Sequence, residues 1–238
     1  MRPVGRSDQL VVECSGVTRR YVIGGRGSAG SGSEVLALQD VDLEVPAGLL
    51  LALAGPSGSG KSTLLALLGA LDRPTSGALR VDGVDVATLG RRERRAFRRR
   101  RAVSMLPLPA DNLLLDLTGR ENVVAAGHHR GLLGDVRSRA DELLAEMELD
   151  AFADRPCALM SGGEQQRIAL AASLIGSSAV VLADEPTGAL DRAGAATVAA
   201  ALRGAVERGA SIVVATHDPN IEAVADMVVR LDHGRRVL

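Results

Sequence analysis

A nine-residue stretch, Gly55–Thr63, constrains the fold of this chain more than any other feature, because it matches G-x-x-x-x-G-K-[ST]. It follows an apolar run, Leu49–Ala54, that is typical of a strand buried on both faces of a parallel sheet. It precedes a helix that we expect over Ser62–Leu71. The glycines let main-chain N–H groups surround a polyphosphate, and the helix N-terminus adds a favourable dipole. The predicted nucleotide-contacting residues are Gly55, Pro56, Ser57, Gly58, Ser59, Gly60, Lys61, Ser62 and Thr63.

Two side chains of this loop have predicted roles of their own. Lys61 offers a mobile ammonium to the β- and γ-phosphates, and Ser62 offers its hydroxyl to Mg²⁺. Lys61 is the only lysine among the 28 basic residues. A guanine-specific NKxD motif needs another lysine, so a GTPase is excluded.

A second segment, Val180–Glu185, carries two carboxylates and completes the expected site. Four apolar residues predict a buried strand that ends in two acids, Asp184 and Glu185. Consecutive side chains on a strand point in opposite directions, which gives the two acids different roles. We expect Asp184 to hold Mg²⁺ through water and Glu185 to polarise the attacking water.

The remaining pattern predicts an α/β fold with a parallel sheet. Ile212–Ala215 is another continuous apolar run, and Val136–Leu149 has helical periodicity with one apolar face. Shorter or half-buried strands and one flexible turn are also expected. The strands are Leu10–Glu13, Val17–Ile23 and Val35–Val45, and the turn is Gly24–Ser33.

Composition excludes several classes of protein. The 238 residues carry a formal charge of −1, which argues against a general nucleic-acid binder. Cys14 and Cys157 lie far apart with no CxxC spacing, so we expect buried free thiols and neither a disulfide scaffold nor a zinc site. Met1–Leu10 is polar, and no apolar run reaches the roughly 18–20 residues of a membrane span. We therefore expect a cytoplasmic protein whose membrane role comes through a partner.

The segment Arg91–Arg101 breaks the charge pattern. It holds eight arginines and one acid, Glu93, for a local charge of +7, so the rest of the chain carries −8. A solvated helix face is the simplest interpretation. Contact with anionic lipid headgroups beside a membrane partner remains open. Nucleic acid is least favoured, because Phe97 is the only aromatic residue in the segment.

The segment Ser161–Arg167, SGGEQQR, resembles the signature of the ATP-binding cassette (ABC) ATPases. A serine and two glycines that open a helix form a second anion-binding helix N-terminus. The resemblance implies a head-to-tail homodimer in which each signature contacts the ATP bound to the other subunit. The implied signature contacts are Ser161, Gly162, Gly163 and Glu164.

Other family landmarks follow from the same resemblance. His217, after Ile212–Ala215, matches the switch histidine that senses the γ-phosphate, which gives the implied catalytic set Lys61, Glu185 and His217. Tyr21 matches the aromatic residue that stacks on adenine, although a strand residue facing the core is the alternative. The D-loop that crosses the dimer interface corresponds to Ala189, Leu190 and Asp191. Three further histidines match no landmark and are expected on the surface: His128, His129 and His233.

The resemblance covers roughly residues 10–238 and is strongest to the macrolide-export and lipoprotein-release branch. It implies one P-loop NTPase (RecA-like) domain with a small antiparallel β subdomain and an inserted α-helical subdomain. The expected core spans about 1–90 and 168–238, and the helical subdomain about 91–167. It also implies ATP and Mg²⁺ as cofactors and a separate transmembrane permease at the inner face of the membrane. An exporter is favoured, and an ATP-gated regulatory subunit that moves no solute is the alternative.

Two positions depart from the family pattern. The family carries a glutamine that contacts Mg²⁺ and the attacking water, in a loop that meets the permease, where this chain has Pro107, Leu108 or Pro109. No glutamine occurs between Gln39 and Gln165. Ala172 also replaces the arginine that usually follows the signature. We hypothesise that ATP binding and dimerisation are kept while hydrolysis or its coupling is weakened.

Overall fold

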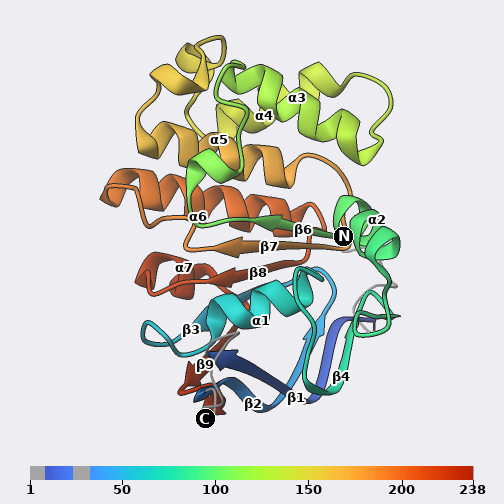
Figure 1. Cartoon of the computed structure of the whole chain (residues 1–238). Coiled ribbons are helices and arrows are strands. Elements are labelled where there is room, and N and C mark those ends of the chain that lie inside the picture. The colour runs from blue at the N-terminus through green and yellow to red at the C-terminus, as the bar shows by residue number, and fades with distance from the viewer. Residues whose placement is uncertain (1–8, 24–32, 238) are drawn as a thin grey trace.

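The computed structural model describes residues 9–23 and 33–237, and a six-stranded sheet forms its centre (Figure 1). The strand order is β10-β9-β3-β8-β7-β6, with β10 antiparallel to β9 and the other neighbours parallel. This confirms the expected α/β parallel sheet. The strands are β3 (Leu50–Ala54), β6 (Ala102–Met105), β7 (Val180–Asp184), β8 (Ile212–Ala215), β9 (Met227–Asp232) and β10 (Arg235–Val237).

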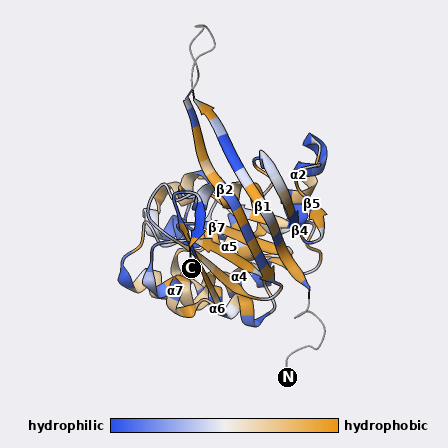
Figure 2. Cartoon of the chain, turned by 90° about the horizontal axis from the view of Figure 1, so that it is seen from below, coloured by the Kyte–Doolittle hydropathy of each residue, from blue (hydrophilic) through white to orange (hydrophobic). Residues whose placement is uncertain are grey.

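A second, antiparallel sheet has the order β2-β1-β4-β5. Its strands are β1 (Leu10–Ile23), β2 (Ser33–Pro46), β4 (Ser76–Val81) and β5 (Val84–Asp85). The two short strands expected before Gly24 form one strand, β1, with a register shift around Gly16, whose φ is 58°. The long β1–β2 hairpin projects from the body of the protein (Figure 2). The expected turn at 24–33 falls, apart from Ser33, outside the described residues.

The central sheet separates two layers of helices. On one face, α1 (Lys61–Leu68) packs with Leu51 and Leu53 in a core shared with the antiparallel sheet. On the other face, Leu50 belongs to the core that includes α5 (Gly162–Leu174) and α6 (Arg192–Glu207). Consecutive strand residues point to opposite faces, so all of β3 is buried, as its unbroken apolar run predicts.

The further helices are α2 (Arg91–Arg100), α3 (Gly119–Arg130), α4 (Val136–Glu146) and α7 (Pro219–Val224), with the 3₁₀ turns η1 (Pro109–Asp111), η2 (Asp150–Phe152) and η3 (Cys157–Leu159). Of these helices, α2 packs on β6, α7 packs on α6 and β3, and α3 and α4 pack on α5. The expected helical segment 91–167 needs one amendment, because β6 lies within it and pairs with β7 in the central sheet. The helix expected over Val136–Leu149 ends earlier, at Glu146.

The expectations about the two cysteines and about three of the histidines are confirmed. Cys14 and Cys157 are both free and buried, and burial raises the pKa of the Cys14 thiol to about 12. The three histidines without a landmark are exposed: His128, His129 and His233. Within residues 9–23 and 33–237, no helix has the length and apolar character of a membrane span.

Candidate functional site

The glycine-rich loop between β3 and α1 is built where the sequence predicts it. Its backbone passes so close to neighbouring segments that side chains are excluded at two positions. A Cβ on Gly55 would lie 2.1 Å from the Leu231 carbonyl oxygen, and one on Gly60 would lie 2.6 Å from the Ala37 carbonyl oxygen. Both glycines also have positive φ, 142° and 103°, a region that favours glycine.

The N-terminus of α1 lacks the side-chain cap that α3, α4, α5 and α6 have. No side chain accepts a hydrogen bond from its first N–H groups, and its first turn has no acidic residue. By contrast, α3, α4, α5 and α6 are capped by Thr118, Asp135, Ser161 and Asp191. The unpaired N–H groups and the dipole of α1 therefore provide a site for an anion.

Lys61 adds a cation to the same place. Its Nζ donates to the carbonyl oxygens of Gly55 (2.8 Å) and Pro56 (3.0 Å), so the ammonium is held inside the loop. The residue is 8% exposed. A phosphate in the loop would meet this ammonium and the free N–H groups of α1 together.

The two acids at the end of β7 face this loop. The pKa of the Asp184 carboxyl is raised above its ordinary value, chiefly by burial; the Ser62 hydroxyl opposes this rise, the charge of Glu185 adds to it, and the charge of Lys61 opposes it. Asp184 therefore lies near Ser62, Glu185 and Lys61, and its role in holding Mg²⁺ with Ser62 stays a prediction. A carboxylate and a hydroxyl are the hard oxygen ligands that Mg²⁺ prefers when phosphate completes its coordination. The described residues contain no cluster of three or more His, Cys, Asp or Glu that would hold a metal alone.

Glu185 and His217 meet across the ends of β7 and β8. The Oε1 atom of Glu185 lies 3.0 Å from Nδ1 of His217, and the His217 side chain is 77% exposed. The other carboxylate oxygen, Oε2, is buried without a hydrogen-bond partner in the described structure. Glu185 has a φ of 47°, a strained conformation for a residue with a side chain. The Glu185 carboxylate is thus held in one orientation, and its Oε2 atom is available to accept a hydrogen bond.

Gln166 is a residue of the site to which the sequence analysis assigned no role. It is 1% exposed, and its Nε2 donates to the main-chain carbonyl of Glu185 at 3.2 Å. Its Oε1 has no hydrogen-bond partner in the described structure. No sequence signal separates Gln166 from its neighbour Gln165, because both are uncharged polar residues in the same segment.

The signature segment opens α5 on the opposite face of the sheet from α1. Ser161 Oγ accepts from the Glu164 N–H at 3.3 Å, and Glu164 Oε2 accepts from the Ser161 N–H at 2.7 Å. The first two residues of the segment, Ser161 and Gly162, are exposed. A Cβ on Gly163 would lie 3.2 Å from Leu190, so the expected D-loop adjoins the signature. The signature is therefore an exposed helix N-terminus separated by the sheet from the loop of the same chain.

The expected adenine contact, Tyr21, is half-buried near the end of β1. Its hydroxyl donates to Asp72 Oδ2 at 2.9 Å, and the Arg19 guanidinium lies 4.3 Å from its ring centroid. Arg19 also pairs with Asp72 at 2.8 Å. One ring face of Tyr21 is thus covered by Arg19, and stacking on adenine stays a prediction for the other.

The loop after β6 has no glutamine, and the side chain of Asn112 holds its main chain together. The side chain of Asn112 accepts from the Leu106 N–H and donates to the carbonyl oxygens of Leu106 and Leu108, each at 2.8 Å. Leu108 is 64% exposed. The expected positions 107–109 thus present two prolines and an exposed leucine, none of which has a polar side-chain group.

The comparisons with known proteins agree with this geometry. The ABC transporter family model matches residues 38–188. The chain is 36% identical over 235 residues to "Lipoprotein-releasing system ATP-binding protein LolD" of Chromohalobacter salexigens, covering 98% of this chain and 95% of that protein. It is 33% identical, with a TM-score of 0.84, to the ATP-binding cassette MJ0796, solved as a dimer in a post-hydrolysis state bound to ADP and Pi. That likeness covers 95% of this chain and 97% of the other.

Longer proteins are also similar to this chain. It is 39% identical over 235 residues to "Macrolide export ATP-binding/permease protein MacB" of Salmonella choleraesuis, and 41% identical over 230 residues to a MacB of Paracoccus denitrificans. The chain covers 34% and 33% of these two proteins, and 95% of this chain is matched in each case. It therefore spans about a third of the length of its MacB relatives.

Proposed function

The chain belongs to the ABC transporter family, and from that premise we propose that two copies of it bind and hydrolyse ATP to drive a separate membrane permease. The observation that carries the proposal is the uncapped N-terminus of α1. This N-terminus is the expected phosphate site. Around it lie Lys61, Asp184 and the Glu185–His217 pair. By contrast, the N-termini of α3, α4 and α6 are each capped by a side chain of the same segment.

Each group has a role that its surroundings support. The loop N–H groups and Lys61 bind the β- and γ-phosphates, and Ser62 and Asp184 would hold Mg²⁺, which neutralises phosphate charge when bound. Glu185 orients the attacking water, and His217, hydrogen-bonded to it, faces the γ-phosphate. The buried, unpartnered Oε2 of Glu185 is the acceptor available for that water.

The dimer follows from the placement of the two helix N-termini. The exposed signature at Ser161 and Gly162 opens away from the chain's own phosphate loop, so it serves the ATP of a second copy. Head-to-tail packing would place Leu190 and Asp191 at the interface, because Leu190 adjoins the signature. The similar cassette MJ0796 was solved as a dimer, which supports this arrangement.

We extend the proposal to the partner and the cellular place. The names of the similar proteins refer to lipoprotein release and macrolide export, so export is favoured over import. The chain would lie at the cytoplasmic face of the membrane, held there by its permease. The loop at 106–112 lacks glutamine, which we infer weakens hydrolysis. The second candidate is an ATP-gated regulatory subunit that controls an extracytoplasmic process and moves no solute.

A hydrolysis-blocked variant tests the main proposal. Glu185→Gln should bind Mg-ATP and form a particle of twice the 24.7 kDa chain mass, measured by light scattering. Mg-ADP should leave it monomeric, and adding Ser161→Arg should prevent dimerisation without loss of ATP binding. A chain that binds ATP yet stays monomeric, even with its permease, would contradict the proposal.

Restoring the glutamine tests the regulatory alternative. Steady-state ATPase rates would be measured, with and without the permease, for Pro107→Gln, Leu108→Gln and Pro109→Gln. We expect one of the three to raise the rate above that of the natural chain. A natural rate equal to that of glutamine-containing cassettes, unchanged by all three substitutions, would refute weakened hydrolysis.

A further inference from the structure

The helix α2 carries positive charge that the described side chains leave without counter-charge. The carboxylate of its one acid, Glu93, accepts from the Gly90 N–H at 2.7 Å and so caps the helix. Arg98 donates to the Ala70 carbonyl at 2.9 Å, and Arg101, just after the helix, pairs with Asp82. None of the other six arginines makes an ion pair or side-chain hydrogen bond within the described ranges. They are Arg91, Arg92, Arg94, Arg95, Arg99 and Arg100.

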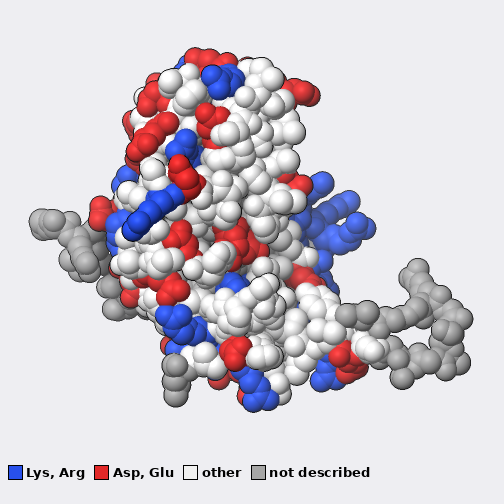
Figure 3. All heavy atoms as spheres, turned by 90° about the vertical axis from the view of Figure 1, so that its left-hand side faces the viewer, with Lys and Arg blue, Asp and Glu red and all other residues white. Residues whose placement is uncertain are grey.

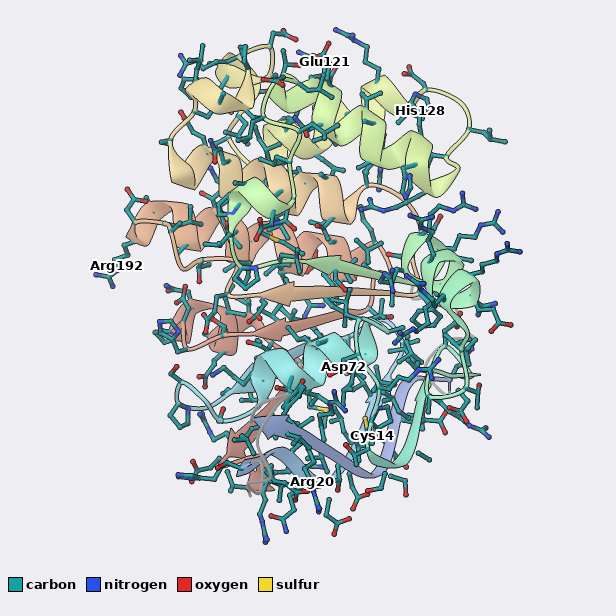
Figure 4. All side chains as sticks on the ribbon, viewed as in Figure 1. Cys14, Arg20, Asp72, Glu121, His128 and Arg192 are labelled. Carbon is teal, nitrogen blue, oxygen red and sulfur yellow. The ribbon has the colours of Figure 1, made fainter. Side chains whose placement is uncertain are left out.

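Four of these arginines form one outward face. Phe97 is 4% exposed and fixes the side of α2 that packs on the protein. At 3.6 residues per turn, the face opposite Phe97 holds Arg91, Arg92, Arg95 and Arg99, all of them exposed. They span about 12 Å along the helix at 1.5 Å per residue. Figure 4 shows the nitrogen-tipped side chains of α2 fanning away from the sheet.

This face is unfavourable for the isolated chain. Arg91, Arg95 and Arg99 are spaced by four residues, where like charges destabilise a helix. Arg91 and Arg92 also lie at the N-terminus of α2, where the helix dipole disfavours a cation. Burial, followed by the charges of Arg94 and Arg95, lowers the pKa of Arg98. Seven described arginines outside this segment pair with an acid, for example Arg203 with Asp226, whereas the outward face of α2 has no such pair among the described residues.

We propose that the outward face of α2 binds the anionic headgroups of a phospholipid bilayer. The inference rests on the proposed function, in which a permease holds the chain against the membrane. The edge strand β6 begins directly after α2 and ends at the loop 106–112. The arginine face and that loop thus lie at the two ends of one short edge strand, on the side of the sheet not covered by another strand.

A planar anionic surface fits the charge distribution better than a nucleic acid does. Figure 3 shows the densest group of basic side chains at one edge of the molecule, with acidic and basic side chains intermixed over the rest of that view. A flat bilayer can contact the arginine face alone. A long nucleic acid would also pass the rest of the protein, whose formal charge of −8 repels phosphate. The helix exposes no aromatic side chain for base stacking, because Phe97 is buried.

Vesicle flotation of the full chain tests the proposal. The vesicles would be phosphatidylcholine alone or with 30 mole percent phosphatidylglycerol, roughly the charge of an anionic leaflet. Each arginine at such a surface contributes about fivefold in partitioning. We expect binding only to the anionic vesicles, lost at high salt, and lowered by about 100-fold or more when Arg91, Arg92, Arg95 and Arg99 are all changed to Gln.

A matched control removes the same charge elsewhere. It changes four exposed arginines outside residues 91–101 to Gln: Arg80, Arg137, Arg235 and Arg236. We expect vesicle binding within about threefold of the natural chain. Equal losses in both variants would overturn the proposal, as would equal binding to duplex DNA at matched phosphate and salt. ATP-driven dimerisation of Glu185→Gln in the same samples separates a failure here from a failure of the proposed function.

Discussion

Replacing Gln166 with methionine tests how the strained backbone of Glu185 is held. The change keeps a long unbranched side chain but removes the Nε2–carbonyl hydrogen bond of 3.2 Å. A buried hydrogen bond of this kind contributes about 1 kcal/mol net. The φ of 47° at Glu185 costs about 1–3 kcal/mol, so the bond offsets much of that strain. Without it, we expect the Glu185 main chain to relax and its carboxylate to move from His217.

The expected effect is on turnover rather than on binding. A loss of about 1–1.4 kcal/mol of transition-state positioning lowers kcat about five- to tenfold. KM for ATP should stay within about twofold, because Gln166 lies beside Glu185 and not in the phosphate loop. Steady-state ATPase kinetics on the full chain measure both quantities.

The neighbouring glutamine provides the matched control. Gln165 lies on the same helix, and its Nε2 donates to the Cys157 carbonyl at 2.7 Å, away from Glu185. Gln165→Met should therefore lose a similar amount of folding stability with kcat unchanged. Equal kcat losses in the two variants would show that Gln166 acts through stability alone and would refute the reasoning.

Three further substitutions or reactions test other parts of the structure. Gly60→Ala would place a Cβ 2.6 Å from the Ala37 carbonyl, so ATP affinity should fall at least about tenfold in a nucleotide titration. Arg130→Met removes the guanidinium that donates to the carbonyls of Ala172 and Ile175 at the end of α5; urea unfolding should show a loss of about 2–3 kcal/mol with an unchanged m-value. Cys14, with its pKa raised to about 12, should resist alkylation at pH 8 in the folded chain and react once it is unfolded.

Local patterns were sufficient to predict the elements that carry the site. The apolar run before Gly55 predicts β3, because a strand buried on both faces needs no polar residue. The glycine-rich loop then requires a helix start, and α1 begins at Lys61. The same reasoning placed β7 directly before Glu185, since both signals are contained in a few consecutive residues.

Contacts between distant segments could not be predicted from those patterns. Gln166 and Glu185 are 19 residues apart, and nothing in either segment indicates which glutamine of the signature helix turns inward. The joining of the two expected strands into β1 could not be predicted either, because it depends on pairing with other strands. The pattern breaks near Gly16, but pairing with β2 and β4 on both sides keeps the chain extended through the irregularity.

The loop after β6 has one feature that the residue types predict and one that they do not. The sequence shows that glutamine is missing, because that statement needs only the residue types. It does not show that Asn112 takes over the main-chain groups of the loop, with both Leu106 groups and the Leu108 carbonyl bound by one amide. Pro107 and Pro109 remove two main-chain donors, and Asn112 pairs with groups that the prolines leave available. Asn112 thus fixes the loop in one conformation, and for this reason we expect glutamine to raise the ATPase rate at only one of the three positions 107–109.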